Sequence, residues 1–190
     1  MALFTGESAR RKRTYLPTIQ RPLKLPSKKA RDRVESKALW NDSRSADGAD
    51  FFTVGYEGRS TEDLLAALTG AGVRTLIDIR FTPLSMYRPE LSKNNFQRRI
   101  EHAGLVYLHC PELGVPKDIR AKAVTSGTRE TIWKWYDDEV ISQRFAFNLH
   151  WFLNLEHPTA MMCVEHDPEE CHRHRIFTAL EKNGLRGYDL

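Results

Sequence analysis

Cysteine is scarce in this sequence: Cys110, Cys163 and Cys171 are its three cysteines among 190 residues. Three cysteines are too few for the disulfide framework of a small secreted domain, so we expect reduced thiols. Long hydrophobic runs are also missing, because no apolar stretch approaches the roughly 20 residues that a membrane-spanning helix needs. The N-terminus lacks the uninterrupted apolar segment of a signal peptide. Together these absences predict a cytoplasmic protein with no membrane partner.

Familiar phosphate-binding motifs are absent as well. Neither common type of glycine-rich phosphate loop is present. The phosphatase and rhodanese loops place an arginine six residues after the catalytic cysteine, and this spacing is not met here. Phe177 lies six residues after Cys171, and Glu169 lies six residues after Cys163. These absences argue against the mechanisms that depend on such loops.

Acidic residues are few in the first 50 positions, which contain 12 of the 29 Lys and Arg but 6 of the 25 Asp and Glu. Residues 1–50 therefore carry a net charge of +6, whereas the whole chain carries +4. Large apolar residues follow no period there, which predicts a basic, poorly ordered N-terminal extension. Such an arm either meets the phosphates of nucleic acid or is a solvated tail.

From Phe51 onward, apolar segments of strand length alternate with helical patterns. Strands are predicted at Phe51–Val54, Val73–Arg80, Leu105–Leu108 and Ala160–Val164, with a short edge strand at Tyr188–Leu190. Helices are predicted after Ser60 or Thr61, at Asn95–His102, across Thr131–Glu156 as one long helix or two with a break, and after Cys171. Residues 115–128 are predicted to form a surface loop, with or without a short helical turn. Because strand, helix and strand follow one another, the strands should be parallel. We therefore predict that residues 51–190 form a single α/β domain, a three-layer α/β/α fold with a mainly parallel sheet of four to five strands.

Ligands of open parallel sheets collect beyond the carboxyl ends of the strands. Each of the four longer predicted strands ends near at least one ionisable group, more than a purely structural sheet needs. The candidate ligand-binding residues are Gly55, Tyr56, Glu57, Arg59, Arg80, His172 and Arg173, and the candidate catalytic residues are Asp78, Glu112, Glu165 and Cys171. We expect these groups to share one pocket for a small anionic ligand.

The charged candidates suggest complementary roles. Arg80 and Arg173 would hold the anion, and Asp78, Glu112 or Glu165 would move a proton, because a partly desolvated carboxylate can have a pKa near neutrality. Structural alternatives stay open for two of them. Asp78 could form an ion pair with Arg80 or Arg173, and Glu112 could cap a turn.

Cys171 is the thiol best suited to reaction. An apolar strand, an acidic turn and a helix start would place it at a helix N-terminus, where backbone amides and two nearby arginines lower a thiol pKa. Cys163 lies among apolar residues, as a core residue would. A zinc site of Cys163, Glu165, Cys171 and His172 is conceivable, but its spacing matches no familiar paired-cysteine pattern. No metal ligand is therefore predicted, and no cofactor is indicated.

Four separated motifs resemble a known family. They are Gly55–Arg59, Leu76–Arg80 with Pro83 and Ser85, His109 with Pro111–Pro116, and Cys163-x-Glu165-x-Asp167-Pro168-x-x-Cys171-His172-Arg173. With Trp135-Tyr136-x-x-Glu139, they resemble the bacterial and archaeal family known as domain of unknown function 488 over about residues 51–190. The resemblance implies a fold and a pocket at these strand ends, but no settled reaction. His174 stands where members often carry a small residue such as Ser.

Three classes of function follow from these patterns. The leading hypothesis is a small enzyme that acts on an anionic ligand, such as a nucleotide or a nucleic-acid component, in the strand-end pocket. One alternative is a non-catalytic nucleic-acid-binding module that uses the basic N-terminal arm. The other is a metal-binding protein.

Overall fold

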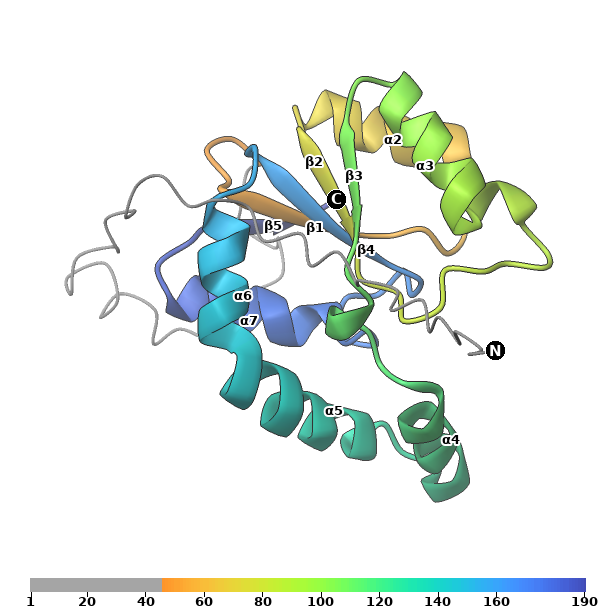
Figure 1. Cartoon of the computed structure of the whole chain (residues 1–190), viewed down its shortest axis with the longest axis vertical. Helices are drawn as coiled ribbons and strands as arrows, with labels where there is room; N and C mark the ends of the chain where they lie inside the picture. Colours follow the sequence, from red (N-terminus) through yellow and green to blue (C-terminus); the bar gives the residue numbers. More distant parts are fainter. Residues whose placement is uncertain (1–45) are drawn as a thin grey trace, which may run out of the picture.

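The computed structural model describes residues 46–190, apart from the side chains of residues 144–148. Its five strands form one sheet in the order β3-β2-β4-β1-β5, and all adjacent strands are parallel (Figure 1). The strands are β1 Phe51–Gly55, β2 Thr75–Asp78, β3 Val106–His109, β4 Thr159–Cys163 and β5 Gly187–Asp189. The predicted parallel sheet and its short edge strand are confirmed. Most of the predicted basic extension, residues 1–45, lies outside the described residues.

Helices cover both faces of the sheet (Figure 1). On one face lie α2 Thr61–Gly70 and α3 Lys93–His102, and on the other lie α6 Gln143–Leu153 and α7 Arg173–Lys182. Because successive strand residues point to opposite faces, Phe52 packs toward α2 and α3 whereas Phe51 packs toward α6 and α7. The three-layer α/β/α fold is therefore confirmed.

The first crossover helix begins as its sequence predicts. Ser60 is the N-cap of α2, and its side chain accepts a hydrogen bond from the backbone N–H of Asp63 at 3.0 Å. Leu64 and Leu68 are fully buried, and Gly72 adopts a φ of 69° just after the helix.

The predicted long helix is one helical stretch with an interruption. Helix α5, Glu130–Tyr136, continues through the π-helical segment η3, Asp137–Ser142, into α6. Tyr136 and Val140 are buried along the face that meets α7 and the sheet. The alternative with a break in the helix is the one that the structure adopts.

The loop predicted for residues 115–128 is wrong, because α4 spans Lys117–Ser126. Pro116 precedes the helix, where its fixed φ and missing N–H cost nothing, and Gly127 ends it with a φ of 67°. Ile119 and Ala123, four residues apart on one helix face, are buried. Pro and Gly at these positions were therefore helix boundary signals rather than loop signals. Two short 3-10 turns, η1 Pro89–Leu91 and η2 Pro111–Leu113, complete the described elements.

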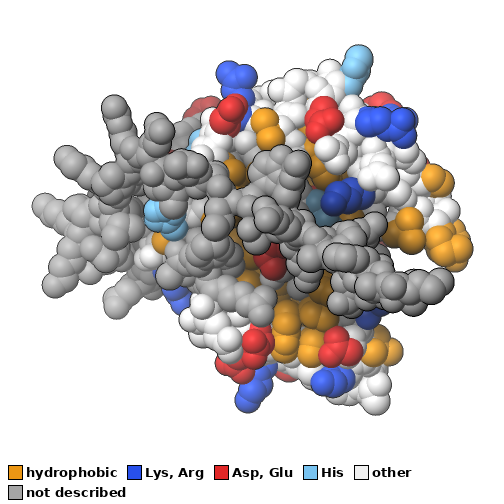
Figure 2. All heavy atoms as spheres, in the orientation of Figure 1, with side chains coloured by type: hydrophobic (Ala, Val, Ile, Leu, Met, Phe, Trp, Pro, Cys, Tyr) orange, Lys and Arg blue, Asp and Glu red, His pale blue; other side chains and the backbone are white. Residues whose placement is uncertain are grey.

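Charge is mixed over the visible surface. On the part of the face in Figure 2 that is coloured by residue type, basic and acidic side chains are interspersed and do not gather into one patch of a single sign. Within residues 46–190, none of the helices combines the length and the apolar character that crossing a bilayer demands.

Gly55 lets two strand ends approach each other closely. A Cβ atom at this position would lie 1.8 Å from the backbone oxygen of Glu165. We expect Gly55→Ala to lower the free energy of unfolding by about 1–3 kcal/mol, as overpacking does, because the strand or the loop must move. Gly58→Ala is the control for glycine replacement near this turn, since nothing lies within 4 Å of its added Cβ, although its φ of 75° adds strain. Urea unfolding measures both, and equal losses would show that the close approach at Gly55 carries no special cost.

Candidate functional site

A cavity of about 200 Å³ lies at the carboxyl ends of β1, β2 and β4. Its lining comes from the loops after these strands and from α4, α5 and the approach to α7: Tyr56, Arg80, Phe81, Thr82, Leu84, Val115, Arg120, Arg129, Ile132, Trp133, Cys163, Val164, Glu165, Glu170 and His172. Four predicted site residues are among them, namely Tyr56, Arg80, Glu165 and His172. Segments far apart in the sequence thus meet at one strand-end cavity.

Two cysteines and a histidine cluster at the floor of the strand-end cavity. The ligand atoms of Cys163, Cys171 and His172 all lie within 4.8 Å of one another. Cys163 Sγ lies 3.7 Å from His172 Nδ1, and Cys171 Sγ lies 4.0 Å from the same nitrogen. Cys163 also donates to Glu165 Oε2 at 3.4 Å. Cys163 is 3% exposed and Cys171 is 1% exposed, so Cys171 lies beneath the lining residues.

The surroundings shift the pKa values of the two thiols in this cluster in opposite directions. Burial opposes ionisation of Cys171, yet hydrogen bonding from Cys163 and the charge of His172 hold its pKa well below the usual thiol value. The pKa of Cys163 is raised, first by its hydrogen bond to Cys171 and then by burial. Burial disfavours the charged form of His172, but the Cys171 thiolate raises its pKa. Burial, followed by the charge of Cys171, raises the pKa of Glu165. Of the two thiols, the surroundings therefore favour ionisation of Cys171 over that of Cys163.

Arg173 holds the loop that carries Glu165. Its side chain is 0% exposed, donates to the carbonyls of Glu165 and His166, and forms an ion pair with Asp189 on β5 at 3.2 Å. The pKa of Arg173 is raised because the charges of Cys171 and Asp189 outweigh burial. Arg173, predicted to hold an anion, does not line the strand-end cavity and has its donors directed to protein acceptors.

Asp78 lies in a buried network beside the strand-end cavity. It is 0% exposed and accepts from Arg80 Nε at 2.8 Å, from Arg80 Nη2 at 2.5 Å and from the Tyr107 hydroxyl at 2.6 Å. Burial and the charge of Asp78 raise the pKa of Tyr107. Arg80 also donates to the Leu91 carbonyl at 2.9 Å and lies 5.3 Å from the centroid of the Tyr56 ring. Among the alternatives from sequence, the ion pair of Asp78 with Arg80 is present.

The remaining predicted residues do not line the strand-end cavity. Glu57 Oε2 accepts from the His166 amide at 3.2 Å, and Arg59 donates to the Leu190 carbonyl at 2.6 Å. Glu112 is exposed on η2, and its charge, after burial, raises the pKa of Cys110. Glu57 and Arg59 thus hold chain segments in place rather than face the ligand space.

Among the lining residues that reasoning from the sequence missed are Arg120, Arg129 and Trp133. Arg120 belongs to α4, where a loop was predicted, and the Pro116 and Gly127 boundary signals could have placed it on a helix. Arg129 lines the strand-end cavity and forms an exposed ion pair with Glu170 at 3.2 Å. Trp133, which lies in the predicted long helix, lines the strand-end cavity and packs edge-on against His174 with 4.8 Å between ring centroids.

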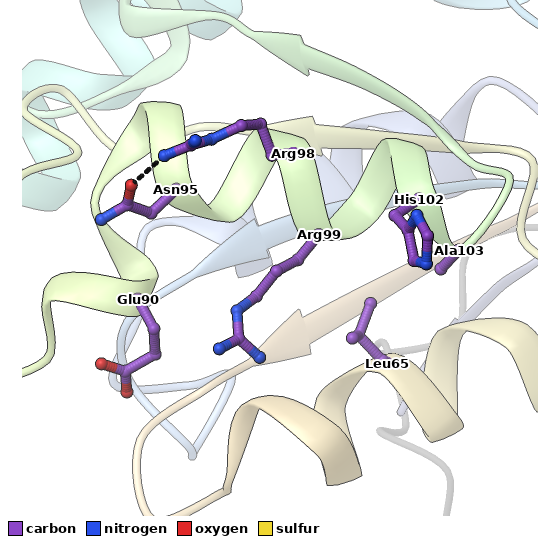
Figure 3. A pocket seen from close by; sticks show the side chains of 7 residues that line it. All are labelled: Leu65, Glu90, Asn95, Arg98, Arg99, His102 and Ala103. Atoms are coloured by element: carbon purple, nitrogen blue, oxygen red, sulfur yellow. Dashed lines mark hydrogen bonds between the residues drawn. The ribbon is translucent and has the colours of Figure 1, made fainter.

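A second, larger hollow of about 660 Å³ lies between α2 and α3 (Figure 3). Arg98 and Arg99 on α3 line it, and Leu65 on α2 lies across from Arg99. Arg98 donates to Asn95 at 2.6 Å, and Arg99 pairs with Glu62 at 3.0 Å. None of its lining side chains is buried, so water solvates its charges. Although this hollow is larger, the strand-end cavity has the buried ionisable groups that chemistry requires.

Comparison with known proteins identifies the family. The model of the family described as "Domain of unknown function DUF488" matches residues 60–180, more than half of the chain. No curated protein and no solved structure matches the chain. The matched region contains the second, third and fourth strand ends with the cysteines and histidine of the cavity floor. The chain therefore belongs to the DUF488 family.

Proposed function

We propose that the chain is a small enzyme that acts on an anionic ligand, with a nucleotide as the favoured class, in the strand-end cavity. One observation carries this proposal: arginines, an apolar wall and buried ionisable groups line the same space. Surface hollows commonly offer one of these features, but a site for chemistry on a charged organic molecule needs all three.

The rim and wall supply the binding functions. Arg120 and Arg129 reach the strand-end cavity from α4 and the start of α5, and guanidinium groups bind phosphate oxygens through paired hydrogen bonds. Trp133 and Ile132 provide an apolar surface against which a base can lie. Arg80 attracts an anionic ligand less strongly than Arg120 and Arg129 do, because its ion pair with Asp78 already neutralises its charge.

Glu165 is the proposed proton-transfer group. It lines the strand-end cavity, is half-buried, and lies beside the Cys163 thiol at 3.4 Å. Cys171 is less well placed for direct attack, because Cys163 and His172 line the strand-end cavity and Cys171 does not. Asp78 and Glu112, the other candidate proton carriers, also lie outside the lining.

The alternative of a nucleic-acid-binding module depends on the basic arm, of which residues 1–45 lie outside the described structure. The visible face of the described residues shows no single-sign basic patch that would favour it (Figure 2). An enzyme acting on a small anion is therefore the function that the described residues support best.

Adenosine monophosphate is the probe we choose for the strand-end cavity. We expect the double variant Arg120→Ala with Arg129→Ala to bind it at least about a hundredfold more weakly than the unchanged protein, because the variant removes two arginines and each charge-assisted hydrogen bond contributes about 1.5–3 kcal/mol. Isothermal titration calorimetry measures the change. Glu165→Gln should bind the probe with little change, since its proposed role is proton transfer rather than binding.

Arg98→Ala with Arg99→Ala is the matched control. It removes two positive charges and breaks one exposed ion pair, Arg99–Glu62, just as the test variant breaks Arg129–Glu170. The control should bind adenosine monophosphate as the unchanged protein does. An affinity that falls equally in both double variants would reflect net charge alone, and no detectable binding by the unchanged protein would remove the nucleotide as the ligand class.

A further inference from the structure

We infer that Cys163, Cys171 and His172 form a binding site for a single zinc-class metal ion, with a fourth coordination position open toward the strand-end cavity. The inference goes beyond the proposed function, because metal binding can occur with or without turnover of an anionic ligand. It rests on the convergence of three side chains from the end of β4 and the approach to α7.

The distances between these groups match tetrahedral coordination. Zinc lies about 2.3 Å from a sulfur ligand and about 2.0 Å from a nitrogen ligand. In a tetrahedral site, such a sulfur and nitrogen are therefore about 3.6 Å apart. The corresponding distances from His172 Nδ1 are 3.7 Å to Cys163 Sγ and 4.0 Å to Cys171 Sγ. Shifts of a few tenths of an ångström therefore bring both sulfur–nitrogen distances to tetrahedral values, and the two sulfurs lie within 4.8 Å of each other. The adjacency of Cys171 and His172 in sequence does not prevent their side chains from converging.

The surroundings of the three donors also suit a metal. The His172 ring faces the two thiols, interacts electrostatically with the backbone of Ile79, and lies 5.2 Å from the ring of Tyr136. Metal-binding histidines commonly engage a backbone carbonyl in this way, which fixes the ring orientation. All three donors are buried, so the chain holds them in place before an ion arrives.

The donor set indicates the class of metal. Two thiolates and one imidazole favour zinc or a similar ion over magnesium or calcium, which prefer oxygen ligands. Glu165 lies 3.4 Å from Cys163 Sγ and lines the strand-end cavity, so it stands beside the open position. Three protein ligands and one open position are the arrangement of catalytic rather than structural zinc sites. A bound ligand could thus meet the ion and the proton-transfer group in the same space.

Cobalt(II) titration of the tag-free, metal-free full chain tests this site, because cobalt bound to thiolates absorbs in the near ultraviolet and tetrahedral cobalt has intense visible bands. We expect one cobalt ion to bind per chain, with an absorption intensity that corresponds to two cobalt–thiolate bonds. Added zinc should displace the cobalt. Cys163→Ser and Cys171→Ser should each weaken binding at least a hundredfold. Cys110→Ser is the matched control: Cys110 is also buried but lies outside the cluster, and this variant should bind as the unchanged protein does.

Two results would overturn the inference: no thiolate absorption in the unchanged protein, or absorption that persists unchanged in both Cys163→Ser and Cys171→Ser. Circular dichroism shows whether each variant folds. If one does not, the cobalt absorption spectrum of the unchanged protein tests the inference, because its intensity reports how many thiolates bind the ion. The binding of adenosine monophosphate to metal-free protein is measured separately. A failed metal site would therefore leave the proposed function standing, and a failed nucleotide titration would leave the metal site standing.

Discussion

Asp78→Ala is expected to lower the free energy of unfolding by about 3–5 kcal/mol, because it leaves the buried charge of Arg80 without its partner. Asp78 is 0% exposed and Arg80 is 5% exposed, so water cannot replace the lost carboxylate. The variant also leaves the Tyr107 hydroxyl without its acceptor. Urea unfolding followed by circular dichroism measures the loss.

Tyr107→Phe is the milder companion of this variant. It removes a single hydrogen bond to Asp78 and leaves the ion pair intact, so we expect a loss of about 1 kcal/mol. If Asp78→Ala instead kept its stability and abolished turnover of an anionic ligand, Asp78 would be the proton carrier that its place at the end of β2 suggested. The structural role proposed for the network would then be wrong.

Arg173→Met should be comparably destabilising, by about 3–5 kcal/mol, because Asp189 loses its buried partner and two loop carbonyls lose their donor. The loop concerned carries Glu165 and His166 beside the cavity floor. The variant is therefore expected to weaken metal binding as well as stability, since Cys163 and Cys171 lie at the two ends of that loop. Urea unfolding and cobalt titration measure the two effects.

Arg175→Met controls for the loss of an arginine from the same helix. Its ion pair with Asp137 at 2.6 Å is partly exposed, with side chains 31% and 44% accessible, so we expect a loss of at most about 1 kcal/mol. Equal losses in the two variants would contradict a special role for Arg173. An unaltered cobalt spectrum in a destabilised Arg173→Met would show that the loop keeps its shape without this side chain.

Local sequence signals predicted most of the fold. Buried apolar runs such as Phe51–Val54 end abruptly at glycine or polar residues, and this contrast marks both a strand and its end. Helix α4 was missed because its polar face dominates its composition, and two buried residues, Ile119 and Ala123, are too few to make a clear period. In that segment the boundary residues Pro116 and Gly127 were more informative than hydrophobicity.

The candidate site was less predictable, because its groups meet through tertiary packing. Sequence placed Tyr56, Arg80, Glu165 and His172 near strand ends, and the structure places them around one cavity. It could not show that Arg173 turns inward to the loop carbonyls, nor that α4 and α5 bring Arg120 and Arg129 to the rim. The same loop folding brings Cys163 to Cys171 and His172, a convergence that their spacing along the chain does not reveal.

An X-ray structure of crystals grown with adenosine monophosphate tests the assignment of the functional site most directly. We expect the phosphate beside Arg120 and Arg129, and the base against Trp133, in the cavity beyond β1, β2 and β4. Nucleotide density in the hollow between α2 and α3, with the strand-end cavity empty, would contradict it.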